Sequence, residues 1–273
     1  MFSRRWAWSC CILPLIMFSF SAYSKEASGS GFLVDTWDVH PAKRERLALD
    51  KAIQGEIPDF IFRMKPITVE EFGHRITFYV SPNYLALGSK DDFFLMPFNF
   101  ISACKIAKHY NAVLPTPKMV DLIYKSADIK LKPATMKPGP SMIRNSYIKK
   151  HDQGIKASLV FQDYHNKLVA GHKKDTVLSN VLSRAKDRIA IYGWHQSESQ
   201  TIQPLSIWHW ANYADYSHGV RLVDRNVVVD GEFWDIADVL SMPEFAPLLS
   251  YEGVLAIDEL MNPHMTPKSL AQQ

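Results

Sequence analysis

A short segment at residues 214–221 concentrates side chains that transfer protons and bind anions. It reads Ala-Asp-Tyr-Ser-His-Gly-Val-Arg and brings Asp215, His218 and Arg221 close together along the chain. Histidine is the side chain best suited to move protons near neutral pH, and a neighbouring carboxylate orients the ring and stabilises its charged form. We therefore predict that Asp215 and His218 are catalytic and that Arg221 holds an anionic group of a substrate. The alternative is a structural histidine at a corner between a strand and a turn.

Ser217 offers a hydroxyl beside His218 and is predicted to belong to the same site. Consecutive residues of an extended strand point to opposite faces, which would separate a serine nucleophile from a histidine base at the next position. Gly219 favours a turn or bulge, which would relax that separation. Because no convincing protein nucleophile is visible, an activated water is the predicted attacking group, and Ser217 is the alternative nucleophile.

Two more histidines follow glycines at the ends of predicted strands. His172 lies in Gly-His-Lys-Lys and His195 lies in Gly-Trp-His, and both are candidate catalytic residues. Together with His218 they would supply three ligands for a catalytic zinc, with Asp175 or Asp215 as a further ligand or as the partner of an imidazole. Their spacing matches no compact zinc motif, so the zinc hypothesis rests on clustering alone.

Aromatic residues crowd the same part of the chain. They are Trp194, Trp208, Trp210, Tyr213 and Tyr216. Aromatic rings line sugar and peptide grooves, but they also fill hydrophobic cores. Trp194 and Tyr216 are predicted to contact a substrate, whereas His209 is interpreted as structural. Cys104 lies in a predicted amphipathic helix with no activating neighbour, which indicates a buried, inert thiol.

The elements that must position these residues predict an α+β fold, with a helix-rich N-terminal half and a mixed or antiparallel sheet in the C-terminal half. Residues 25–40 are aperiodic and are expected to form a loose arm, and residues 132–141, with three prolines, are expected to form a loop or linker between regions 25–131 and 142–273. The predicted helices cover 44–53, 100–110, a helix capped by Thr116 with Pro117 as its first residue, 141–150, and 236–249 interrupted by two prolines. The predicted strands cover 74–80 (paired with 84–87), 167–170, 188–192, and a hairpin of 219–223 with 226–229.

The first residues predict export. Two arginines precede an apolar run that ends in Ala-Tyr-Ser, which is typical of a signal peptide cleaved after Ser24. Cleavage would leave Cys104 as the one cysteine, so no intramolecular disulfide is expected. Charge is nearly balanced, with 31 Lys and Arg against 28 Asp and Glu, which does not match the basic surface of a nucleic-acid-binding protein. No second apolar segment is long enough to span a membrane, so none is expected in the mature chain.

Residues 217–222, Ser-His-Gly-Val-Arg-Leu, resemble the Ser-His-Gly-Cys-x-Arg signature of L,D-transpeptidases, exported enzymes that remodel peptidoglycan cross-links. Residues 191–195 are similar to another histidine segment of that family. Val220 stands where the family has its nucleophilic cysteine, and Arg221 comes one position early, so a cysteine acyl-enzyme carried by this motif is excluded. More of the chain, at 114–121, 170–175, 192–195 and 215–222, resembles a group of exported bacterial proteins. That resemblance implies a shared family core and no activity.

Export, clustered histidines and the partial likeness to peptidoglycan enzymes together predict a periplasmic or secreted hydrolase of the bacterial cell envelope. Its expected substrate is the peptide part of peptidoglycan. An alternative from another class is a non-catalytic exported protein that holds glycan or peptide in an aromatic groove. An exported effector or toxin is a third function that the sequence does not distinguish from these.

Overall fold

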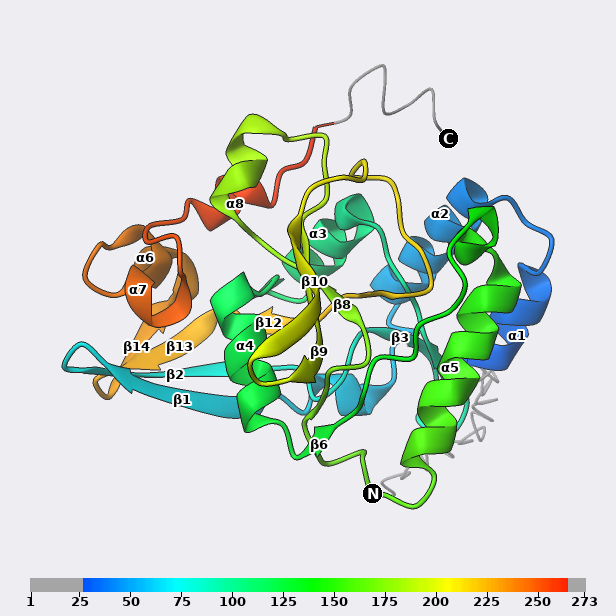
Figure 1. Ribbon diagram of the computed structural model, residues 1–273, viewed down its shortest axis with the longest axis horizontal. Helices are drawn as coiled ribbons and strands as arrows, with labels where there is room; N and C mark the ends of the chain where they lie inside the picture. Colours follow the sequence, from blue (N-terminus) through cyan, green and yellow to red (C-terminus); the bar gives the residue numbers. More distant parts are fainter. Residues whose placement is uncertain (1–26, 265–273) are drawn as a thin grey trace, which may run out of the picture.

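The computed structural model describes residues 27–264, so the predicted signal peptide lies outside the described residues. The described chain is α+β, as predicted (Figure 1). Its α-helices are α1 Gly29–Asp35, α2 Pro41–Ile53, α3 Phe100–His109, α4 Pro117–Ser126, α5 Asn145–Leu159, α6 Ile236–Ser241, α7 Ala246–Leu249 and α8 Ile257–Leu260. Its strands are β1 Lys65–Glu71, β2 His74–Val80, β3 Ala86–Gly88, β4 Phe93–Leu95, β5 Ala112–Val113, β6 Ile129–Lys130, β7 Val169–Ala170, β8 Lys174–Thr176, β9 Ile191–Ser197, β10 Gln200–Ser206, β11 His218–Gly219, β12 Val223–Asp224, β13 Asn226–Val229 and β14 Glu232–Asp235. None of the helices within 27–264 is both long and apolar enough to span a membrane.

Two sheets organise the described chain. The six-stranded sheet has the order β14-β13-β2-β12-β5, with β1 paired to β2, and all of its pairs are antiparallel. The four-stranded sheet has the order β10-β9-β8-β11 and is mixed, because β11 runs parallel to β8. The second sheet comes entirely from the C-terminal half, but the first takes strands from both halves. The predicted division into a helix-rich first half and a strand-rich second half is therefore not clearly seen.

One short segment, residues 218–224, joins the two sheets. Its first residues form β11, where His218 pairs with Lys174 of β8. Its last residues form β12, where Val223 pairs with β2 on one side and with β5 on the other. The turn that follows Asp215 therefore leads directly into the contact between the sheets.

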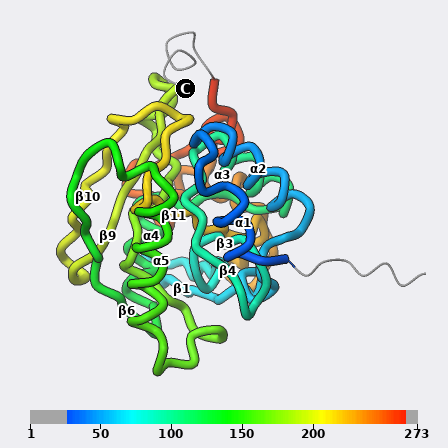
Figure 2. Tube along the Cα trace, turned by 90° about the vertical axis from the view of Figure 1, so that its right-hand side faces the viewer, coloured from blue at the N-terminus to red at the C-terminus, as the bar shows by residue number. Residues whose placement is uncertain are grey.

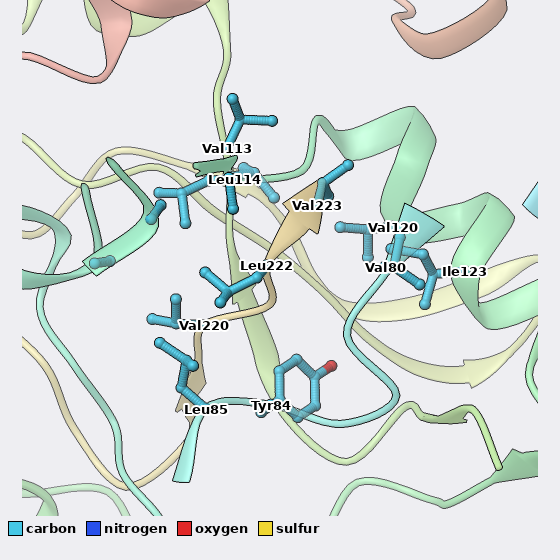
Figure 3. Close-up of a cluster of buried hydrophobic side chains, with 14 of the residues drawn as sticks. Val80, Tyr84, Leu85, Val113, Leu114, Val120, Ile123, Val220, Leu222 and Val223 are labelled. Atoms are coloured by element: carbon cyan, nitrogen blue, oxygen red, sulfur yellow. The ribbon is translucent and has the colours of Figure 1, made fainter. Parts of the chain in front are cut away.

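The residues between β11 and β12 are buried in the main hydrophobic cluster. Val220 and Leu222 alternate with Arg221, and their side chains lie among apolar residues of β2, β5 and α4 and of the chain that follows β2 (Figure 3). The amide of Leu85 donates to the carbonyl of Val220, and the amide of Ser81 donates to the carbonyl of Leu222, both at 2.8 Å. This segment is therefore fixed by main-chain hydrogen bonds as well as by packing.

Helix prediction succeeded where local capping chemistry was visible. Thr116 accepts a hydrogen bond from the amide of Met119, and α4 begins at Pro117, as predicted. The expected loose arm at 25–40 is wrong for the described residues, because these form α1 and end in His40, the N-cap of α2. Ser28 caps α1, and Gly29 lies so close to the β3–β4 hairpin that a Cβ there would come within 2.7 Å of the carbonyl oxygen of Leu87.

Strand prediction located β2 and β13 but paired them wrongly. β2 pairs with β1 across the turn at Phe72 and Gly73, both with positive φ, and not with residues 84–87. Strands β12 and β13 both pair with β2, so the predicted 220–229 hairpin does not form. The hairpin is instead β13–β14, closed by Asp230 and Gly231 with φ of 51° and 92°. An Asp-Gly pair between strands is a strong hairpin signal because both positions need positive φ.

The helices lie around the sheets in separate groups. Helices α6 and α7 pack beside β13 and β14 at one end of the molecule, whereas α1, α2 and α5 lie toward the other (Figure 1). Turned by 90°, the molecule shows α1, α2 and α3 on one side, β9 and β10 on the other, and β11 between them (Figure 2). The segment with Asp215 and His218 is therefore central.

Glycine is expected to be required at position 219, in the segment that joins the two sheets. A Cβ at this position would lie 2.6 Å from the ring of Tyr84 and 2.9 Å from Cβ of Lys173, both buried. Gly219→Ala should lower the free energy of unfolding by about 1–3 kcal/mol, because the buried ring must shift. The measurement is a urea unfolding curve of the mature protein.

The matched control is Gly154→Ala, in α5, where a Cβ meets no heavy atom within 4 Å. It should raise stability by about 0.5–1 kcal/mol, since alanine favours the helix over glycine. An unchanged unfolding midpoint for Gly219→Ala would contradict the close packing of Tyr84 against the segment.

Candidate functional site

The carboxylate of Asp215 is held in place by its own segment. One oxygen accepts hydrogen bonds from the amide of Ser217 at 2.8 Å and from its hydroxyl at 2.6 Å. The other oxygen accepts a hydrogen bond from the hydroxyl of Tyr213 at 3.2 Å. Burial pushes the pKa of Asp215 upward, but the nearby His218 and the bonds from Ser217 outweigh it and hold the pKa below its usual value. Asp215 is therefore a buried anion at neutral pH.

His218 is the least satisfied polar group of the segment. Its side chain is 0 % exposed, and neither ring nitrogen has a hydrogen-bond partner among the described residues. Burial lowers the pKa of His218 to about 4, against the opposing effect of the Asp215 carboxylate. The imidazole is therefore neutral at pH 7 and can accept a proton. Its ring centroid lies 5.7 Å from that of Tyr213 and 6.2 Å from that of His209.

Ser217 is not paired with His218 in this arrangement. Its hydroxyl donates to Asp215, while both ring nitrogens of His218 lack partners among the described residues. A serine nucleophile needs a base within hydrogen-bonding reach of its hydroxyl. The observed geometry therefore gives Ser217 the role of anchoring Asp215.

Two further titratable groups lie close to this cluster, and neither was among the predicted site residues. Lys173 was interpreted as solvated, but it is buried. Lys173 donates from Nζ to the carbonyl of Tyr216 at 2.8 Å, and burial lowers the pKa of Lys173 to about 8. His151, on the buried face of α5, contacts the ring of Tyr216 with the centroids 4.9 Å apart. Burial, reinforced by Lys173, lowers the pKa of His151 to about 3, and its ring nitrogens also lack partners among the described residues. The sequence signal for His151 was its helical spacing with the apolar residues Ile148 and Ile155, which predicts that it lies on the buried face of the helix.

Arg221 and Asp175 lie in a second buried cluster. The guanidinium of Arg221 is 0 % exposed and donates to the carbonyls of Ser81 at 2.6 Å and Val169 at 2.8 Å. It lies over the ring of Tyr84, whose hydroxyl donates to Asp175 at 2.7 Å. Burial raises the pKa of Asp175 to about 6. Arg221 is thus fully buried, with two main-chain carbonyls as acceptors and Nε 3.9 Å from the Asp175 carboxylate, and it does not lie at a surface where a substrate carboxylate would meet it.

The three strand-end histidines lie in three different settings. A ring nitrogen of His172 is 3.1 Å from the side-chain oxygen of Asn83, and Nε2 of His195 is 2.8 Å from the Asp121 carboxylate. His218 belongs to the Asp215 cluster. Within residues 27–264, no three His, Cys, Asp or Glu side chains converge as metal ligands, so the predicted set of His172, His195, His218 and Asp175 is not assembled.

The pair of His195 with Asp121 forms a separate polar group near the surface. The other carboxylate oxygen of Asp121 accepts hydrogen bonds from the hydroxyls of Tyr192 at 3.2 Å and Tyr251 at 2.9 Å. The ring of Tyr124 stacks on His195 with the centroids 4.4 Å apart. These aromatic and hydroxyl contacts fix the imidazole between α4 and β9.

The aromatic residues divide between core and surface. Trp194 and Tyr216, the predicted substrate contacts, are buried and pack against each other with centroids 6.5 Å apart. Trp208 is 81 % exposed, and Trp210 lies with its ring under the guanidinium of Arg188. Cys104 is buried, and burial raises the pKa of its thiol far above the usual range, as expected for an inert cysteine.

A cavity of about 400 Å³ lies next to the Asp215 cluster. It opens between the starts of α2 and α3 and the chain at residues 210–214, and Tyr213 and Ala214 form part of its wall. Tyr213 therefore belongs to both the cavity and the cluster, because it lines the cavity, its hydroxyl donates to Asp215 and its ring lies 5.7 Å from that of His218. The cavity supplies space for a ligand, and the cluster behind Tyr213 supplies a neutral imidazole beside an anion.

Comparison with known proteins gives no relative from which a role could be transferred. No protein-family model, curated protein or solved structure matches the chain. The resemblance of residues 217–222 to the L,D-transpeptidase signature stays a prediction. Function must therefore be inferred from the residues and geometry of the chain itself.

The buried histidines make stability depend on pH. The pKa of His151 falls from 6.5 to about 3 on folding, so its neutral form contributes stability above pH 6.5 that is lost as the pH falls. Between pH 4 and 6 the unfolded chain binds one more proton at this site. His151→Gln should therefore reduce the slope of unfolding free energy against pH by about 1.4 kcal/mol per pH unit.

The measurement is a series of urea unfolding curves from pH 4 to 7. His109→Gln, at an exposed histidine of α3, is the matched control and should leave the slope as in the parent protein. Equal slopes for His151→Gln and the parent protein would contradict the burial of a neutral His151.

Proposed function

We propose that the protein is an exported hydrolase of the bacterial cell envelope that acts on the peptide part of peptidoglycan. The observation that carries the proposal is His218, a fully buried imidazole whose two nitrogens have no hydrogen-bond partner within residues 27–264. It lies beside the Asp215 anion and contacts Tyr213, which lines a ligand-sized cavity. Perturbed titratable groups next to a cavity are typical of active sites. Periplasmic or secreted location rests on the predicted signal peptide.

The proposed step uses His218 as a general base. A water admitted beside Tyr213 gives a proton to the neutral His218 ring while its oxygen bonds to the carbonyl carbon of the substrate. The Asp215 carboxylate stabilises the imidazolium that forms, since opposite charges in a buried site attract strongly. The carbon–nitrogen bond then breaks, and the imidazolium returns the proton to the leaving amine. Atoms and charge balance without a protein nucleophile.

The other predicted site residues have supporting roles in this proposal. Arg221 and Asp175 hold the chain that carries His218, through the bonds to Ser81, Val169 and Tyr84. His172 and His195 stand apart from the proposed step, each with a polar partner of its own. A zinc requirement is a separate hypothesis, and it predicts stoichiometric zinc in the purified protein and loss of turnover with a chelator.

A non-catalytic binding protein is the rival function. It is favoured by the cavity lining, where Trp210 and Tyr213 offer aromatic surface to a glycan or peptide. The rival predicts that Trp210→Ala weakens ligand binding and that Trp208→Ala, which removes an exposed ring, also weakens it. It predicts that His218→Ala leaves the affinity nearly unchanged.

Replacing His218 tests the hydrolase directly. His218→Gln keeps a polar side chain of similar size but cannot act as the base, so turnover of purified sacculi should fall about 10²–10⁴-fold. His218→Ala should show the same loss. The measurement is release of soluble peptide fragments from sacculi by the mature protein, with a thermal unfolding curve recorded for each variant.

His109→Gln serves as the control for replacing a histidine at an exposed site. Turnover by folded His218→Gln and His218→Ala at the rate of the parent protein would overturn the assignment of His218. Absence of turnover by the parent protein, with binding that depends on Trp210, would favour the rival.

A further inference from the structure

We propose that the cavity between α2, α3 and residues 210–214 binds the terminal carboxylate of a peptide substrate. This inference rests on the proposed function and deepens it, because it assigns the substrate class as peptides with a free carboxyl end. It also replaces the sequence-based expectation that Arg221 holds this group, since Arg221 is fully buried on main-chain carbonyls.

The charge of the cavity lining favours an anion. Three cationic side chains, Arg44, Arg46 and Lys105, contribute to it, against one carboxyl group, that of Glu45. Arg46 and Lys105 are exposed at the rim, whereas Arg44 and Glu45 are buried. The rim cations would attract a negatively charged group, and the buried Arg44 would fix its orientation.

Arg44 has an unused donor at this cavity. Its side chain is 3 % exposed, and one terminal nitrogen donates to the carbonyl of Ile143 at 2.8 Å and to the side-chain oxygen of Asn145 at 2.9 Å. Its Nε is buried with no hydrogen-bond partner among the described residues. A buried unpaired donor is costly, by about 1–3 kcal/mol, unless a partner supplies the acceptor. Both described side-chain hydrogen bonds of Arg44 go to neutral groups, and its charged neighbour, Glu45, accepts from the amide of Asn99. A ligand carboxylate would supply the acceptor that Nε lacks.

Two helices begin at the cavity, and one of them already holds a carboxylate. At the start of α3, the amide of Asn99 donates to Glu45 at 2.9 Å. At the start of α2, residues His40, Pro41 and Ala42 line the cavity. The first amides of a helix and its dipole favour an anion. Glu45 occupies the position at α3. At α2, Pro41 has no N–H, and the amides of Ala42, Lys43 and Arg44 already donate to His40. The helix dipole favours an anion at both starts, but the hydrogen bonds to a ligand must come from side chains, and Arg44 is the buried one.

The position of the cavity connects this anion site to the proposed chemistry. Tyr213 lines the cavity and donates to Asp215, with its ring 5.7 Å from that of His218. A carboxylate beside Arg44 would direct the adjoining peptide toward Tyr213. The bond presented to His218 would then lie near the carboxyl end, and the expected product is a released amino acid or short peptide.

Calorimetric titration of the mature protein tests the carboxylate site without requiring turnover. The probes are tri-alanine with a free carboxylate and tri-alanine amide, which differ only in the terminal charge. The free acid should bind at least tenfold more tightly than the amide. Inorganic phosphate should bind more weakly than the free acid. Equal affinities for acid and amide, or tighter binding of phosphate, would overturn the proposal.

Variants on one helix locate the site. Arg44→Lys keeps the charge but loses Nε and the planar fork, so the affinity for the free acid should fall about tenfold or more. Arg46→Gln, at the exposed rim, should weaken binding about two- to fivefold. Lys43→Gln removes the same charge from an exposed position on α2 outside the cavity lining and should leave the affinity unchanged. An equal effect of Lys43→Gln and Arg46→Gln would overturn the location.

Folding failure of Arg44→Lys would leave the test intact, because the comparison of Arg46→Gln with Lys43→Gln uses exposed residues. The titration is repeated with His218→Gln to separate the two proposals. Acid-specific binding without turnover by the parent protein would contradict the hydrolase and support the cavity assignment. Turnover that depends on His218, with equal binding of acid and amide, would support the hydrolase and contradict the cavity assignment.

Discussion

The structure depends on carrying a polar segment through the interior of the protein. Residues 215–224 run between the sheets, and β11 and β12 belong one to each sheet. An unpaired polar group in such a place costs about 1–3 kcal/mol, so the segment must supply partners for its own side chains. Asp215 accepts hydrogen bonds from Ser217 and Tyr213, and Arg221 donates to two main-chain carbonyls. Both sheets are thus joined by a segment whose Asp215 is fully hydrogen-bonded and whose Arg221 has two main-chain acceptors, with Nε 3.9 Å from the Asp175 carboxylate.

Two buried histidines in or near this segment have no hydrogen-bond partner at either ring nitrogen among the described residues. They are His218 and His151, and both lie close enough to Lys173 and Asp215 for those charges to affect their pKa. A folded protein tolerates such groups most readily where they serve a purpose other than stability. Tyr213 lines the adjoining cavity and contacts the ring of His218, so the proposed chemistry requires water to reach His218 past Tyr213. His218 therefore carries the proposed chemistry on a segment that the hydrogen bonds of Asp215 and Arg221 hold in place.

The sequence predicted local features better than distant ones. The Thr116 cap and the alternation of 74–80 depend on neighbours along the chain, and α4 and β2 form as expected. The pairing of β2 with β12 and β13 depends on contacts more than 140 residues apart, which no local pattern encodes. Likewise, the sequence placed Asp215, Ser217 and His218 in one cluster, but it could not separate His172 and His195 from them. Glu45 and Arg44 were missed because the cavity forms only when α2 meets α3 and residues 210–214.

Histidine titration by nuclear magnetic resonance tests the central claim most directly, namely that a neutral, buried His218 is accessible to a ligand from the cavity. The ¹⁵N spectrum of the mature protein is recorded from pH 4 to 8, with His218→Gln identifying the resonances. We predict that His218 stays neutral down to about pH 4 and that both of its nitrogen resonances shift when tri-alanine is added. Titration near pH 6.5, or resonances unaffected by saturating peptide, would contradict the account.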